Sequence, residues 1–297
     1  MSIIEKHVVP ENIGKIRLSD YAREIFQKYI PSRNGIKKAI KKELIIVDEQ
    51  PSTTGLWVKP GQRITLLKAT KQRKLFQQKL PIVYEDEYLA IINKPAGLLV
   101  SGNQFRTVEN ALEFNLSSSH QPDALTKMRP VHRLDRLTSG LLIIAKTKNC
   151  QKTSDKMFKE HRIEKRYQAI VMGKMPKQGK IDKKIEDKPA LTNFQRIKTV
   201  PSLKSEWLSL VDLWLESGRT HQLRIHLAQA GFPILGDTLY AEPGRTLQGS
   251  GLFLTAVQLK FAHPVTKNIL NFTIEPPHKF KLQLAREKQR YYKFNPE

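Results

Sequence analysis

The sequence predicts an α+β fold in which a mixed, largely antiparallel sheet follows a small N-terminal unit. Three observations lead to this prediction. From residue 82 onward, short runs of apolar and β-branched residues recur between turn residues, as strands do. Only a few segments with helical spacing lie among these runs, a mixture typical of α+β domains. Before residue 82, two short amphipathic helices precede a small hairpin.

The chain is strongly basic. Its 297 residues include 51 Lys and Arg against 28 Asp and Glu, which gives a formal net charge of +23. A charge of this size favours a polyanionic partner, most simply nucleic acid. An acidic membrane surface is the competing partner, but no uninterrupted apolar stretch approaches the roughly 20 residues that cross a bilayer. We therefore expect an RNA or DNA partner and no membrane.

The cysteine content and the N-terminus indicate the compartment. Residues 1–28 lack the apolar central segment of a signal peptide. The single cysteine, Cys150, excludes a disulfide framework within one chain and suits a reducing environment. We therefore expect a cytoplasmic protein.

Neither a metal nor a nucleotide cofactor is expected. His221 and His226 are five residues apart, about 140° around a helix, and neither has a cysteine nearby. The segment GRTLQGSG at 244–251 has the glycine spacing of a phosphate-binding loop, but it lacks the lysine that would follow.

The N-terminal unit begins with two predicted helices. The first follows a candidate cap at Ser19 and ends before Pro31. Ser32 caps the second. The apolar residues that define their buried faces are Leu18, Tyr21, Ala22, Ile25, Phe26 and Tyr29 in the first helix and Ile36, Ala39 and Ile40 in the second.

The second helix carries a basic face. Arg33, Lys37 and Lys41 are spaced i, i+4, i+8, with Lys38 and Lys42 beside them. Like charges at this spacing cost helix stability, which an anionic partner would offset. A face that is merely solvated is the alternative interpretation.

Strands at 44–47 and 64–67 complete the unit, and the sequence PSRNGIKKAIKKELIIVD within it resembles the alpha-L RNA-binding motif of a small-subunit ribosomal protein. The likeness covers roughly residues 15 to 70. Residues 1–80 contain 17 basic and 7 acidic side chains, so they supply +10 of the net charge. We therefore expect an RNA-binding domain at 1–72, a basic linker at 73–80 and a second domain at 81–297.

The elements expected in the second domain follow from the same patterns. A sharp turn at Pro95 and Gly97 is expected to expose Lys94. Asn149 is the candidate cap of the second helix. Strands are predicted at 82–84, 89–92, 98–100, 165–172, 207–216, 252–261 and 269–274, and helices at 107–116, from 149 to about 161, and within 217–231.

The stretch VHRLDRLTSGLLIIAK, residues 131–146, combines a polar loop with a buried strand. Such a loop holds the Asp135 carboxylate at the end of a rigid element, beside Arg133 and Arg136. An aspartate in a loop is also a common turn residue with no chemical role. The stretch alone therefore leaves a reactive and a structural role for Asp135 open.

Four segments together resemble the RluA-type pseudouridine synthase family. They are INKPAGLLV at 92–100, HRLDRLTSGLL at 132–142, KRYQAIVMG at 165–173 and SGRTHQLRIHLAQAGFPILGDTLY at 217–240. They occur in the family's order over about 200 residues. The resemblance implies a central mixed sheet with a cleft, and uridine in structured RNA as the substrate. It departs from the family at Ser101-Gly102, where members commonly carry a histidine-proline pair.

The resemblance also implies roles for single residues. Asp135 matches the catalytic aspartate, proposed to attack C6 of the uracil or C1′ of the ribose. Tyr167 matches a tyrosine that stacks on the extruded base and helps to remove the C5 proton, although a strand tyrosine is often plain core. Arg224 matches the arginine that pairs with the aspartate and would hold it by a bidentate fork. Arg133 matches a residue that enters the RNA, whereas we expect His132 to be a structural hydrogen-bonding group.

The predicted reaction is isomerisation of specific uridines, with ribosomal large-subunit RNA favoured over transfer RNA and a monomeric enzyme. One ionised carboxylate can serve throughout, without a metal or cofactor. Two alternatives remain open. An RNA base glycosylase would cut the same bond but typically needs two carboxylates. A non-catalytic RNA-binding or ribosome-assembly factor would need only the basic domain.

Overall fold

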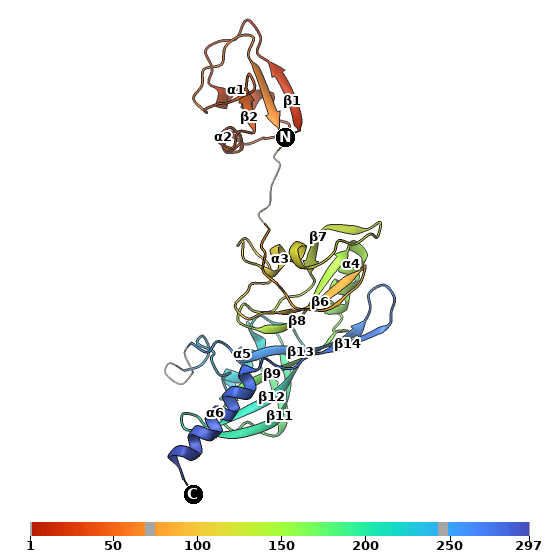
Figure 1. Cartoon of the computed structure of the whole chain (residues 1–297), viewed down its shortest axis with the longest axis vertical. Helices are drawn as coiled ribbons and strands as arrows, with labels where there is room; N and C mark the ends of the chain where they lie inside the picture. The colour runs from red at the N-terminus through yellow and green to blue at the C-terminus, as the bar shows by residue number, and fades with distance from the viewer. Residues whose placement is uncertain (1, 69–74, 243–248, 297) are drawn as a thin grey trace. The chain divides into compact units, whose positions relative to one another are not determined.

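The structure is a computed structural model that describes residues 2–68, 75–242 and 249–296. It contains two compact units, residues 1–74 and 75–297 (Figure 1). Each has its own apolar core. We describe them separately as the N-terminal unit and the C-terminal unit.

The N-terminal unit packs two helices against a small antiparallel sheet with the strand order β1-β4-β2-β3. Its strands are β1 (Ile3–Val8), β2 (Ile45–Val47), β3 (Gln50–Pro51) and β4 (Arg63–Leu67), and its helices are α1 (Leu18–Ile25) and α2 (Arg33–Lys41). Strand β1 is absent from the predicted elements. None of its side chains is fully buried, so it lacks the apolar alternation that reveals a strand.

The two helix starts differ in how well the sequence predicts them. Ser32 caps α2 as predicted, because its Oγ accepts a hydrogen bond from the Gly35 backbone N–H at 3.0 Å. The Ser19 cap is wrong: α1 already begins at Leu18, and Ser19 is buried in its first turn. Helix α1 also stops well before Pro31, at Ile25.

The C-terminal unit is built on ten strands. Eight follow the order β10-β11-β12-β9-β13-β8-β6-β5, with β14 paired to β13 and β7 to β8. Among the described strands, β8 and β13 form the only parallel pair, which confirms the predicted mixed, largely antiparallel sheet. The strands are β5 (Ile82–Glu85), β6 (Leu89–Lys94), β7 (Ala124–Pro130), β8 (Ser139–Thr147), β9 (Glu164–Met172), β10 (Gln178–Asp182), β11 (Leu191–Ser202), β12 (Glu206–Leu215), β13 (Leu254–Ala262) and β14 (Ile269–Thr273).

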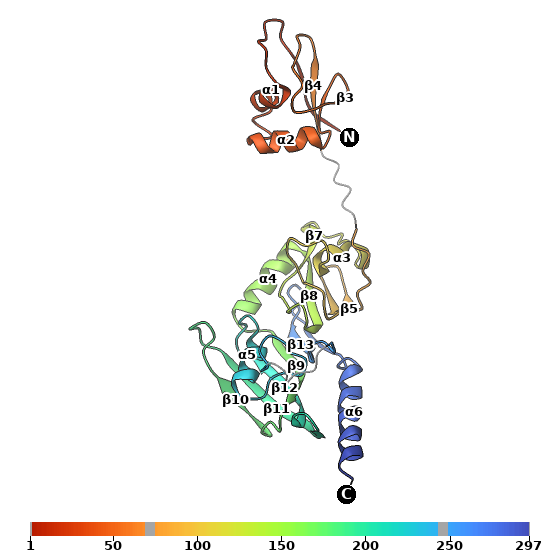
Figure 2. The same cartoon turned by 90° about the vertical axis from the view of Figure 1, so that its left-hand side faces the viewer.

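Four helices accompany this sheet: α3 (Val108–Asn115), α4 (Lys148–Lys159), α5 (Gln222–Gln229) and α6 (Lys279–Phe294). Thr147 caps α4, because its Oγ1 accepts the Cys150 N–H at 3.2 Å, so the predicted cap at Asn149 is wrong. Helix α6 packs on β11 (Figure 2). It is absent from the predicted elements because its buried side is a narrow stripe within a basic and aromatic sequence. Strands β7, β10 and β11 are also absent from the prediction.

The predicted linker at 73–80 includes residues that pack on the C-terminal unit. Leu80 is buried, and its N–H donates to Asn115 Oδ1 at 2.8 Å. Phe76 packs against the core of this unit, with its ring centroid 5.5 Å from that of Phe105. Residues 73 and 74 lie outside the described residues.

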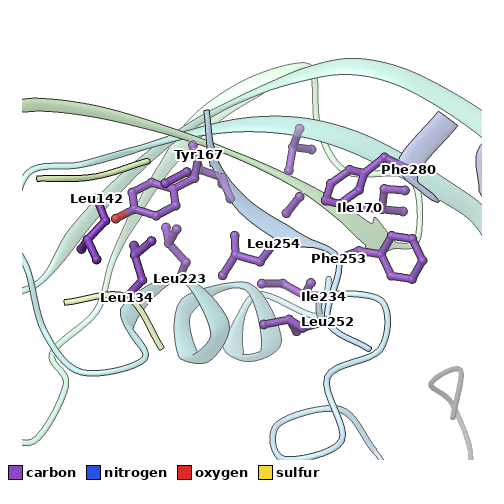
Figure 3. Close-up of a cluster of buried hydrophobic side chains, with 14 of the residues drawn as sticks. Leu134, Leu142, Tyr167, Ile170, Leu223, Ile234, Leu252, Phe253, Leu254 and Phe280 are labelled. Carbon is purple, nitrogen blue, oxygen red and sulfur yellow. The ribbon is translucent and has the colours of Figure 1, made fainter. Parts of the chain in front are cut away.

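Strand β8 is buried on both faces, which explains its continuous apolar run. Leu142 and Ile144 belong to one apolar cluster, whereas Leu141 and Ile143 belong to another. Figure 3 shows part of the first cluster, with Tyr167 at one end of it. The loop that carries Asp135 leads directly into this strand, so an element that is buried along its whole length anchors it.

Gly140 allows β8 to approach β13 closely. Its φ is +116°, and a Cβ atom built there would lie 2.2 Å from the Ala256 backbone oxygen. Gly140→Ala is therefore expected to lower the free energy of unfolding of the C-terminal unit by about 3 kcal/mol or more, through backbone strain and overlap.

Denaturant titration measures this loss. Gly218→Ala is the matched control, because Gly218 has no positive φ and no atom within 4 Å of its added Cβ. An equal loss in both variants would contradict the close approach as the cause.

Candidate active site

A cavity of about 280 Å³ brings together the three residues that the sequence proposes for catalysis. Asp135, Tyr167 and Arg224 come from the loop before β8, from β9 and from α5. Arg133 and His132 line the same cavity. Segments 32 and 89 residues from Asp135 along the sequence thus share one site.

The Asp135 loop is fixed to the turn after β6 by one backbone hydrogen bond and one side-chain hydrogen bond. The Gly97 N–H donates to the Arg136 carbonyl at 2.7 Å, and Arg136 Nε donates to the Gly97 carbonyl at 3.1 Å. The Thr138 N–H donates to the carbonyl of Asp135 at 3.1 Å. These contacts pair the carbonyls of Asp135 and Arg136 and so hold the loop that carries the carboxylate.

Lys94 is buried, so the predicted exposure of this residue is wrong. Its Nζ donates to the carbonyls of Pro95 and Leu98 at 2.9 and 2.8 Å and lies 3.3 Å from that of Arg136. Burial lowers the pKa of Lys94 to about 8, against the opposing effect of the Asp135 charge. The ammonium therefore supports the Asp135 loop from inside.

Arg224 lies beside Asp135 but does not fork onto it. Its Nη1 is 3.9 Å from Asp135 Oδ2, whereas its Nε and Nη2 bind the two oxygens of Asp237 at 2.8 and 2.9 Å. The predicted bidentate pairing with Asp135 is therefore wrong. Asp237 occupies the Nε/Nη2 edge of the guanidinium, and only Nη1 approaches Asp135, beyond hydrogen-bond distance.

Asp237 is a site residue that the sequence analysis does not single out. It is almost fully buried, and it also accepts the N–H groups of Leu239 and Tyr240. Burial raises the pKa of this carboxyl, but the Arg224 hydrogen bonds and the backbone donors outweigh burial and lower it below the usual aspartate value. The only signal in the sequence is its place in the segment Gly236-Asp237, next to a tight turn.

His221 lines the cavity beside Asp135, and Tyr240 supports it from behind. The Nε2 of His221 lies 3.6 Å from Asp135 Oδ1, and its Nδ1 is 2.8 Å from the Tyr240 hydroxyl. His221 adopts a left-handed conformation, φ +54°, immediately before α5. The Arg224 guanidinium lies 5.0 Å from the centroid of the Tyr240 ring. The sequence offers His221 only as an unpaired metal-ligand candidate.

Tyr167 is part of the core and of the cavity wall. Burial raises the pKa of its phenol, and the nearby Asp135 charge raises it further. Figure 3 shows its hydroxyl near Leu134 and Leu142, at the end of the cluster opposite Phe280. The phenol is therefore neutral and its ring is held in place.

His132 makes a structural hydrogen bond, because the Ile143 N–H donates to its Nε2 at 3.1 Å. Burial and the neighbouring Lys165 lower the pKa of His132 to about 3. The imidazole is neutral, and its ring lies 4.8 Å from that of Phe158. It supports the loop rather than transferring protons.

The remaining predicted RNA contacts are exposed cations. Arg133 is exposed at the cavity. In the N-terminal unit, Arg33 forms an ion pair with Asp20 at 3.0 Å. The four lysines of the basic face are exposed, namely Lys37, Lys38, Lys41 and Lys42.

Two searches of the described residues concern other kinds of site. No group of three or more His, Cys, Asp or Glu side chains in the described part of the chain could hold a metal ion. None of the described helices is long and apolar enough to cross a lipid bilayer. Most of the glycine-rich segment 244–251 lies outside the described residues.

Comparison with known proteins identifies the family. The family model described as RNA pseudouridylate synthase matches residues 88–229. Ribosomal large subunit pseudouridine synthase D of Nitrosomonas europaea is 31% identical over 293 residues, which cover 88% of this chain and 81% of the relative. Dual-specificity RNA pseudouridine synthase RluA of Pasteurella multocida is 36% identical over 214 residues, which cover 66% of this chain and 93% of the relative.

A solved structure shares the fold. The human protein named RNA Pseudouridylate Synthase Domain Containing 4 superposes with a TM-score of 0.57 at 25% identity, covering 69% of this chain and 92% of that chain. The membership predicted from the four sequence segments is confirmed. Sequence, fold and matched range agree that this chain belongs to the RNA pseudouridine synthase family.

Proposed function

We propose that the chain isomerises specific uridines in structured RNA to pseudouridine, with Asp135 as the catalytic carboxylate. The observation that supports this assignment most is the cavity itself. Asp135 is the only carboxylate among the described residues that line it, and Tyr167 lines the same cavity. His221 Nε2 and Arg224 Nη1 lie 3.6 and 3.9 Å from the two oxygens of this carboxylate. This is the arrangement that a base-handling carboxylate requires.

The reaction balances without any further reactant. The N1–C1′ bond of uridine breaks, the base turns, and a C5–C1′ bond forms. A proton leaves C5 and N1 gains one. Asp135 attacks C6 or C1′ and is released again at the end, so it is regenerated. Arg224 Nη1 lies 3.9 Å from Asp135 Oδ2 and so places a positive charge beside the carboxylate.

Tyr167 provides the surface against which the base is held. Extruding a uridine from folded RNA costs a few kcal/mol. Stacking on an aromatic ring returns roughly 1–3 kcal/mol. The pKa of the phenol is raised, so the phenol is neutral. It can take a proton from C5 only while its own O–H proton moves to another group. Packing of the Tyr167 ring in the core fixes the plane in which the uracil lies.

Ribosomal large-subunit RNA is the proposed substrate, with transfer RNA as the second choice. One relative is named as a synthase of the ribosomal large subunit, and another as a dual-specificity enzyme. Residues 1–80 carry a net charge of +10, which suits a large folded RNA. The enzyme acts as a monomer in the cytoplasm, and its residues 1–72 form an alpha-L type RNA-binding domain.

The test is an assay of the purified protein on ribosomal and transfer RNA, with pseudouridine and free uracil measured together. We expect pseudouridine and no free uracil. Release of free uracil would identify the chain as an RNA base glycosylase. If neither product forms, the chain is a non-catalytic RNA-binding factor. Mapping pseudouridines in cellular RNA with and without the gene then identifies the position.

The basic face of α2 is expected to bind phosphates. Lys37→Gln with Lys41→Gln should lower the slope of log affinity against log salt by about 1.8 on a duplex RNA, roughly 0.9 per lost contact. Filter binding over a salt series measures this slope. Lys6→Gln with Lys59→Gln is the matched control, since both lysines are exposed in the same unit. Equal slopes in both double variants would show that the face of α2 is only solvated.

A further inference from the structure

A second groove, of about 510 Å³, lies on the other side of the Asp135 loop. Arg136, the residue after Asp135, lines this groove together with Gly97 and Arg106. Asp135 itself faces the cavity described above. The loop that carries the catalytic carboxylate thus separates two hollows, and the proposed reaction uses only one.

The charge of the groove has a single sign. Among the described residues that line it are two arginines, Arg106 and Arg136, and no aspartate or glutamate. Both arginines are exposed. Arg106 forms no hydrogen bond or ion pair with any residue that the structure describes, and Arg136 donates only its Nε, to the Gly97 carbonyl. Such a surface suits an anion with more than one charge.

The segment that carries Arg106 is held in place before any ligand arrives. The Asn110 side-chain amide on α3 donates to the carbonyls of Gln104 and Phe105 at 3.2 and 3.0 Å. The Phe105 ring is 52% exposed although it contacts Phe76, a residue of the groove wall. A fixed loop that presents a cation and an exposed ring loses little entropy on binding.

We propose that this groove binds the RNA backbone beside the target uridine, with Arg106 and Arg136 on its phosphates and Phe105 against a neighbouring base. The proposal rests on the proposed function. An RNA strand carries one phosphate per nucleotide, so a strand whose uridine enters the Asp135 cavity places phosphates along the loop on either side. An aromatic ring next to cations is the usual platform for single-stranded RNA.

Ser101-Gly102 lies in the segment that borders this groove. At this position, the family commonly carries a histidine-proline pair. Residues 101–106 are all exposed, and Gly102 has a φ of +131°, a conformation that proline cannot adopt. The path of this segment therefore differs from the one that a histidine-proline pair would take. We infer that the groove contributes to the choice of RNA rather than to the chemical step.

The experiment compares Arg106→Ala with Arg286→Ala in the full chain. Arg286 is an exposed arginine on α6, so both variants lose one surface charge. The probe is poly(U), titrated over a salt series. Arg106→Ala should lower the slope of log affinity against log salt by about 0.7, which is roughly a fourfold loss of affinity at 0.15 M salt. Arg106→Lys should keep the slope, and Arg286→Ala should leave it unchanged.

A second measurement locates the contact. RNA that contains 4-thiouridine is crosslinked to the wild-type chain, and the modified peptides are identified by mass spectrometry. We expect crosslinks at Phe105 or Phe76, which Arg106→Ala reduces. If the groove binds an acidic protein segment instead of RNA, Arg106→Ala and Arg286→Ala will show the same affinity for poly(U) and the same crosslinks. That result would overturn the proposal.

The outcomes separate the groove from the proposed function. If the wild-type chain makes pseudouridine while Arg106→Ala binds poly(U) with unchanged slope and crosslinks, the groove assignment is wrong and the reaction stands. The opposite outcome is that the wild-type chain makes no pseudouridine, while Arg106→Ala lowers the salt slope of poly(U) binding and the crosslinks. The groove assignment is then supported and the proposed reaction is wrong.

Discussion

Asp135→Asn is expected to reduce pseudouridine formation by at least about 10⁴-fold, while RNA binding persists. Asparagine has nearly the same shape as aspartate, but it has no negative charge and is a poor nucleophile. Residues that form the covalent bond in other enzymes typically cost this much when they are removed. The measurement is single-turnover conversion of ribosomal RNA by the purified variant, together with its affinity for the same RNA.

The control for this variant is Asp187→Asn. Asp187 is exposed and has a φ of +59°, which asparagine also tolerates. It lies outside the lining of the cavity, so its loss should leave conversion within about twofold of the wild type. Retained activity in the Asp135→Asn protein would remove Asp135 from the mechanism and favour a role as a turn residue.

Asp237→Asn is expected to lower the free energy of unfolding by about 3 kcal/mol and kcat by about 10²-fold. The stability loss arises because the buried Arg224 guanidinium loses its charged partner. The rate falls because Arg224 is then free to shift relative to Asp135, and displacements of about 1 Å carry this cost. Denaturant titration and single-turnover rates measure the two effects.

Asp86→Asn is the control for Asp237→Asn. It distinguishes the loss of Arg224 positioning from a general loss of stability. Asp86 also accepts backbone N–H groups, from Tyr88 and Leu89, but it does not line the Asp135 cavity. This variant should lose stability without a change in kcat at temperatures where it stays folded. If both variants lose the same fraction of kcat, Asp237 is only a structural residue.

The stability conferred by Asp237 should depend on pH in a predictable direction. Its pKa in the folded chain is lowered, so its carboxylate stabilises the fold above the unfolded value, near 3.9. This contribution is lost as the pH falls through the lower folded value. The difference in unfolding free energy between wild type and Asp237→Asn should therefore be constant at neutral pH and shrink below about pH 4.

Several features could be predicted from the sequence because they depend on neighbours in the chain. The buried run of β8, the Ser32 cap of α2 and the apolar stripe of Ile36, Ala39 and Ile40 all follow from local patterns. Strand β1 has mostly exposed side chains, and helix α6 buries only a narrow stripe. Neither element therefore leaves a comparable pattern in the sequence. They form because other strands pair with them or pack against them.

The candidate site divides in the same way. Asp135, Tyr167 and Arg224 could be proposed because their segments resemble those of the RNA pseudouridine synthase family. The carboxylate that receives the Arg224 fork is Asp237 and not the predicted Asp135, and no local sequence pattern distinguishes these two partners. The tertiary structure places Asp237 at 2.8 Å and Asp135 at 3.9 Å.

The sequence by itself therefore determined the α+β class, the basic N-terminal unit and the three residue types that a uridine isomerase needs. Only the tertiary structure decided that Lys94 is buried under the Asp135 loop, that Asp237 holds Arg224 and that His221 stands beside the carboxylate. The physical reason is that hydrogen bonds and ion pairs depend on distances of a few ångströms. Those distances are set where separate segments pack together, and no local pattern records them.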